Sequence, residues 1–89
     1  DEWSEIEQAP GSTVIGFQKN EDYVPPVWPE APGAQQQMVH LDFGVEKSRM
    51  AEAVAHAVAC GAKVSPAQYS DHWTVMIDPA GHPFCFVER

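Results

Sequence analysis

The segment of residues 71–86 constrains the fold more than any other, because its pattern predicts a β-hairpin. In the run Trp73–Ile77, β-branched and aromatic side chains alternate with the period of two that is typical of a strand. The next four residues favour a turn, since Pro79 fixes its own φ and Gly81 can adopt a positive φ without steric cost. An apolar run at residues 84–87 then returns as the second strand.

A looser copy of this hairpin occurs at residues 1–18, where two short strands flank the turn Ala9–Ser12. When the copies are aligned on Trp3 and Trp73, Gln18 becomes the counterpart of Cys85. The spacing from Trp3 to Gln18 is three residues longer than that from Trp73 to Cys85. Two similar hairpins about 70 residues apart indicate a duplicated module.

Residues 38–89 predict a complete β-α-β-β-β unit. Its first strand, at residues 38–45, alternates so that His40 and Asp42 lie on one face and Leu41 and Phe43 on the other. A helix from residue 46 or 48 to residue 60 follows, and then a short strand at residues 62–64. The apolar stripe of the helix has the spacing i, i+3, i+4, i+7 at Ala51, Val54, Ala55 and Val58, and it is widened by Met50 and Ala57. The fold class is therefore α+β.

Residues 19–37 are rich in proline, which excludes a helix or a central strand there. One interpretation is a linker between the first hairpin and the complete unit. The other is a segment that packs against the sheet or a partner, because linkers rarely carry Tyr23, Val27 and Trp28 together.

Composition narrows the functional classes. The 89 residues form a single domain, residues 1–89, and their net charge of −8 without a Lys/Arg cluster argues against nucleic-acid binding. No apolar run reaches the length of about 18 residues that a spanning helix needs. Cys60 and Cys85 belong to no disulfide framework, and we expect both to be reduced thiols in a cytoplasmic protein.

Five segments together resemble the glyoxalase-like domains of the vicinal oxygen chelate (glyoxalase/bleomycin-resistance/dioxygenase) superfamily. They are residues 16–18, 25–29, 36–42, 60–62 and 78–85. The resemblance implies two βαβββ modules whose curved sheets enclose a cavity. The sequence holds one complete module at residues 38–89, and at residues 1–18 only the hairpin of a partial first module. We therefore expect a homodimer, or further residues before Asp1, to complete the first module.

The resemblance also points to site residues. Members with metal centres carry a His on the first strand and a Glu on the last strand of each module. His40 matches the His position, but Cys85 and Gln18 stand where Glu is expected. Because Gln is a poor ligand and the set is incomplete, we expect no metal and no other cofactor.

We expect His40, Asp42, Gln18 and Cys85 to line the concave face of the sheet, with His40 paired to Asp42 or to a backbone carbonyl. The sequence places no base near Cys85, which argues against a nucleophilic role. Trp28 is the further binding residue we expect, either as a lid over the cavity or as an anchor in a subunit interface.

The predicted function is metal-independent binding of a small organic molecule of unknown identity in an open, mostly apolar cavity. Two alternatives remain: a metal-dependent lyase, isomerase or dioxygenase of the superfamily, and a structural dimerisation module.

Overall fold

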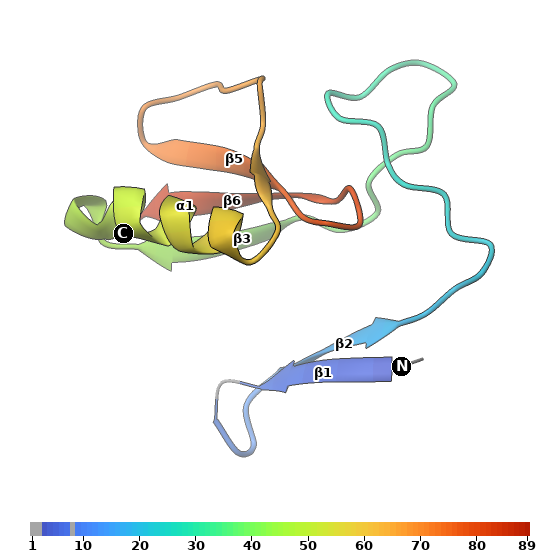
Figure 1. Ribbon diagram of the computed structural model, residues 1–89, viewed down its shortest axis with the longest axis horizontal. Coiled ribbons are helices and arrows are strands. Elements are labelled where there is room, and N and C mark those ends of the chain that lie inside the picture. Colours follow the sequence, from blue (N-terminus) through green and yellow to red (C-terminus); the bar gives the residue numbers. More distant parts are fainter. Residues whose placement is uncertain (1–2, 8) are drawn as a thin grey trace.

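The computed structural model describes residues 3–7 and 9–89, which form two β-sheets and one α-helix (Figure 1). The first sheet is the antiparallel hairpin of β1 (Trp3–Glu7) and β2 (Val14–Gln18). The second sheet has the strand order β3-β6-β5-β4. Its strands are β3 (Leu41–Val45), β4 (Lys63–Val64), β5 (Trp73–Ile77) and β6 (Pro83–Glu88). Among the described residues, no helix has the length and apolar character to cross a membrane.

The four-stranded sheet confirms the predicted α+β class and the β-α-β-β-β order. Strand β3 pairs with β6 in parallel, whereas β5 pairs with both β6 and β4 in antiparallel orientation. The chain therefore leaves β3 at one edge, crosses the sheet through α1 (Met50–Ala59), and re-enters at β4 on the opposite edge (Figure 1). Strands β5 and β6 become the two central strands.

Helix α1 begins later than predicted, because residues Lys47–Arg49 form a 3₁₀ turn, η1, before it. The half-buried residues of α1 are Met50, Ala53, Val54 and Ala57. Half of the predicted stripe is confirmed, since Met50, Val54 and Ala57 are half-buried. The other half was wrong, since Ala51, Ala55 and Val58 are exposed. Both stripes have the same i, i+3, i+4, i+7 spacing. In a helix so rich in alanine, either set can face a sheet, and the pattern alone does not decide between them.

Strand β3 is shorter than predicted, since it begins at Leu41. Leu41 pairs with Phe84, so the next pair toward the N-terminus would set His40 opposite Pro83. Proline has no N–H to donate to the ladder, and the pairing stops there. Met38 and Val39 remain outside the strand and are 81% and 65% exposed.

The core lies on the central strands, where Val75, Met76, Pro83 and Cys85 are buried. On one face, the rings of Phe43, Phe84 and Phe86 meet at centroid distances of 5.6 to 6.2 Å. Crossovers between parallel strands are right-handed in nearly all proteins, and the connection through α1 lays the helix over one face of the sheet (Figure 1).

The first hairpin has the predicted strands, and Ser12 N–H donates to the Ala9 carbonyl in the predicted turn. The predicted counterpart of Gln18 was wrong. Gln18 pairs with Trp3, and Val87 pairs with Trp73, so Gln18 corresponds to Val87 and not to Cys85. The physical reason is that strand pairing, and not residue type, defines equivalent positions.

The proline-rich segment packs against the turn between β5 and β6. The Tyr23 hydroxyl donates to the Ala80 carbonyl at 2.7 Å, and Pro26 is buried. A Cβ added to Gly81, whose φ is +96°, would lie 3.2 Å from Pro25. These contacts confirm the interpretation in which the segment packs on the sheet and contradict that of a free linker.

Candidate functional site

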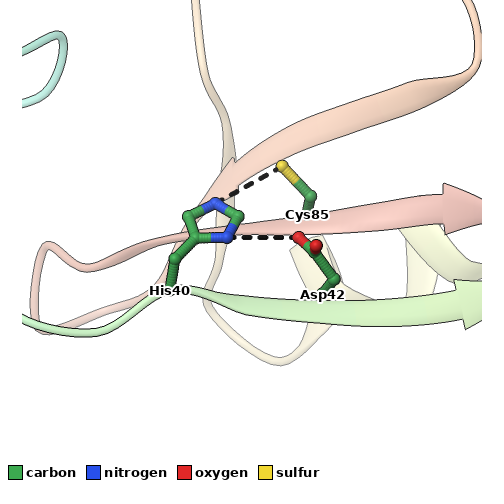
Figure 2. A group of neighbouring side chains, drawn as sticks. All are labelled: His40, Asp42 and Cys85. Carbon is green, nitrogen blue, oxygen red and sulfur yellow. Dashed lines mark hydrogen bonds and ion pairs between the residues drawn. The ribbon is translucent and has the colours of Figure 1, made fainter.

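His40, Asp42 and Cys85 come together on the face of the four-stranded sheet opposite α1 (Figure 2). His40 precedes β3 and Asp42 lies within it, so the period of two directs both side chains to the same face. Cys85 lies on β6 directly across from Asp42 in the parallel register. The pairing of β3 with β6 therefore builds the group from two distant parts of the chain.

The imidazole of His40 lies between the other two side chains. Its Nδ1 is 3.1 Å from Asp42 Oδ1, and its Nε2 is 3.6 Å from Cys85 Sγ. A neutral imidazole carries one N–H donor and one acceptor nitrogen. Because a carboxylate only accepts, Nδ1 bears the hydrogen and Nε2 is left to accept one from the thiol. Pairing of His40 with Asp42 was one of the two predicted partners and is confirmed.

Burial differs strongly across the group. The side chains of His40 and Asp42 are 33% and 51% exposed, whereas Cys85 is only 6% exposed. Burial raises the pKa of the Cys85 thiol above its ordinary value, and the negative charge of Asp42 adds to the increase. The thiol therefore stays protonated at neutral pH and donates to His40.

The prediction that no base lies near Cys85 was wrong. His40 Nε2 stands at hydrogen-bonding distance from the sulfur. The two residues are far apart in sequence, and only the parallel register of β3 and β6 brings them together.

The three side chains form a possible metal-binding group, because one donor atom of each lies within 4.8 Å of the others. Their arrangement does not fit a three-ligand centre, however. Only one nitrogen of an imidazole can bind a given ion, and Cys85 lies at Nε2 while Asp42 engages Nδ1. An ion at Nε2 would meet two ligands, fewer than the three or four protein ligands of zinc sites.

The other two predicted site residues lie elsewhere. Gln18 is exposed at the end of β2, in the two-stranded sheet. Trp28 packs edge-to-face on Tyr69, with ring centroids 6.4 Å apart, and its Nε1 is buried without a hydrogen-bond partner. The structure thus groups three of the five predicted residues.

Apart from this group, a hollow lies between the proline-rich segment and the β5–β6 turn, with a volume of about 220 Å³. Its polar lining includes Tyr23 and His82, whose rings lie 5.7 Å apart. Burial, and to a lesser degree the charge of Asp78, raises the pKa of Tyr23 above its ordinary value. No pattern in the sequence predicts this hollow, because its two walls are distant along the chain.

The model of a family described as a glyoxalase-like domain matches residues 1–87. No curated protein and no solved structure matches the chain.

Proposed function

Because the chain belongs to the family of glyoxalase-like domains, we propose that it binds a small organic molecule on the sheet face that carries His40, Asp42 and Cys85. The observation that carries this proposal is the convergence of these three side chains on one face, where His40 lies at hydrogen-bonding distance from both Asp42 and Cys85. The side chains of His40 and Asp42 are 33% and 51% exposed, so these two residues offer the part of the group that a ligand can reach.

The neighbouring side chains support the same assignment. In the register of β5 with β6, Val75 lies across from Cys85 and Trp73 lies across from Val87. Small-molecule sites are mostly apolar with a few polar groups that fix orientation. The apolar side chains of Val75, Trp73 and Val87, together with one imidazole, one carboxylate and one thiol, have that composition.

Charge narrows the class of ligand. The chain carries a net charge of −8, and Asp42 stands within the site. Such a field disfavours anions. We therefore assign to the site an uncharged molecule with a carbonyl or a similar polar group.

The binding is proposed to need no metal, since His40 divides its two nitrogens between Asp42 and Cys85. Elemental analysis of the purified protein should find no stoichiometric zinc, iron, manganese or nickel. About one metal per chain, lost in His40→Ala, would contradict this proposal. It would favour instead a metal-dependent lyase, isomerase or dioxygenase, for which the proximity of the three donor groups is the specific support.

The binding proposal is tested by NMR titration with a panel of uncharged carbonyl fragments, N-ethylsuccinimide among them. Amide shifts should concentrate at Asp42, Cys85 and Val75. The side-chain signals of Leu41 and Phe43 serve as controls and should not shift, because alternation along β3 directs these side chains to the other face. Shifts confined to the α1 face, or none with any fragment, would contradict the assignment.

We also propose that two copies of the chain associate through the β1–β2 hairpin. Its apolar side chains Trp3, Ile6, Val14 and Phe17 are 43 to 53% exposed. An isolated two-stranded sheet is marginal in water, and its unpaired edges favour association. Sedimentation at micromolar concentration should give a dimer, and a well-folded monomer of 9.8 kDa would contradict the proposal.

The two cysteines support a reducing, cytoplasmic location as part of this proposal, since both are free thiols.

A further inference from the structure

We infer that Cys85, His40 and Asp42 act together as a nucleophilic thiol group that captures a small, uncharged α,β-unsaturated carbonyl compound by covalent addition to the Cys85 sulfur. This inference rests on the proposed function, because it uses the same face of the sheet. It names the chemistry of that site and the class of molecule that would react there.

The geometry is that of an activated nucleophile. Such groups place a base within hydrogen-bond reach of the nucleophile and a third group that orients the base. Here Cys85 Sγ lies 3.6 Å from His40 Nε2, and His40 Nδ1 lies 3.1 Å from Asp42 Oδ1. Asp42 and Cys85 are held across from each other on paired strands, which fixes their separation.

Asp42 has a positioning role. By accepting a hydrogen bond from Nδ1–H, its carboxylate keeps the lone pair of Nε2 directed at the thiol (Figure 2). It also stabilises the imidazolium that forms when the thiol gives up its proton.

The resting state of Cys85 makes His40 necessary. The thiol is buried beside a carboxylate, and both influences favour its protonated form. Thiolate, and not thiol, is the reactive species. Attack on carbon therefore requires that the proton pass to His40 Nε2.

Conjugate addition needs nothing beyond these groups. The thiol proton moves to Nε2 while the sulfur forms a bond to the β-carbon of the unsaturated carbonyl. The π electrons of the double bond shift to give an enolate, and Nε2–H returns the proton to the α-carbon. A thioether results, no group leaves, and no oxidant or reductant is consumed.

The surroundings select the class of electrophile. Sulfur is a soft nucleophile and favours a soft carbon centre. The charge of Asp42 and of the whole chain disfavours carboxylates and phosphates. Cys85 is 6% exposed and the side chain of His40 is 33% exposed, so the molecule must be small and must approach across the imidazole.

The test uses N-ethylmaleimide as the probe, with addition followed by intact-protein mass spectrometry. The parent and the His40, Asp42 and His72 variants carry Cys60→Ser, so that Cys85 is the single thiol in each. A separate Cys85→Ser variant keeps Cys60 as a reference thiol. His40→Gln should slow the addition by about 100-fold, the order that a positioned base supplies. His72→Gln is the matched control, because His72 is an exposed histidine whose partner is Glu88, and it should leave the rate unchanged.

Asp42→Asn gives a second, independent result. It should slow the addition and also shift His40 to the Nε2–H tautomer, a spectroscopic change that a purely structural role would not produce. Equal circular dichroism spectra of all variants establish that they are folded.

The inference is overturned if His40→Gln reacts as fast as its parent. It is also overturned if Cys85 stays unmodified during the time in which Cys60 of a Cys85→Ser variant reacts completely. If N-ethylsuccinimide still shifts the amides of Asp42 and Cys85 in either case, the covalent chemistry is contradicted but the proposed binding function is not. If N-ethylsuccinimide also causes no shifts, the proposed binding function is contradicted as well.

Discussion

Substitution of Phe43 by alanine should destabilise the protein substantially, because this side chain joins β3 to β6. Its ring lies 5.9 Å from that of Phe84 and 6.2 Å from that of Phe86. Truncation of a fully buried phenylalanine costs about 3–5 kcal/mol. Phe43 is 39% exposed and hence only about three-fifths buried, so we expect a loss of about 2–3 kcal/mol.

Thermal unfolding followed by circular dichroism measures this effect. In a domain of this size, 1 kcal/mol corresponds to about 4–8 °C, so the Tm should fall by roughly 8–24 °C. Met38→Ala is the control, since Met38 is 81% exposed and its loss should cost no more than about 0.5 kcal/mol. A Phe43→Ala protein that melts within 2 °C of the parent would refute the assignment of the aromatic face to the core.

Three further changes test other parts of the fold. Gln68→Ala should cost about 1–3 kcal/mol, because the Gln68 amide bonds both the N–H and the C=O of buried Val75 at 2.8 Å; urea denaturation measures it. Gly61→Ala should cost about 1–2 kcal/mol in the same assay, since Gly61 has a φ of +109°. Burial, and then the charge of Asp78, raises the pKa of Tyr23 in the folded protein. The neutral phenol therefore stabilises the fold at pH values below the pKa that Tyr23 has in the unfolded chain, and this stabilisation is lost as the pH rises through the folded pKa. Between pH 9 and 11.5 the Tm of the parent should therefore fall more steeply than that of Tyr23→Phe, and parallel curves would contradict this.

The hairpins could be predicted from sequence because local rules determine them. The alternation in β5 and the turn that follows lie within a few residues of each other. In that turn, Asp78 Oδ1 accepts hydrogen bonds from the backbone N–H groups of Ala80 and His82. Side chains of this type stabilise turns through contacts close in the chain.

The features that sequence reasoning missed depend on distant contacts. The approach of His40 to Cys85 requires the parallel register of β3 and β6. The contact of Tyr23 with Ala80 likewise joins segments 57 residues apart. The buried face of α1 was predicted only in part for another reason, since its alanines allow two stripes of equal spacing.

The tautomer of His40 tests the central claim most directly. In the proposed arrangement, Nδ1 of His40 carries the hydrogen that is bonded to Asp42, and Nε2 accepts a hydrogen bond from Cys85. A long-range ¹H–¹⁵N correlation spectrum of histidine-labelled, metal-free protein distinguishes the two ring nitrogens at an alkaline pH, where imidazoles are neutral. The signals of His40 are assigned by their absence in His40→Gln. We predict the Nδ1–H form, and a His40 that holds its hydrogen on Nε2 would contradict the account.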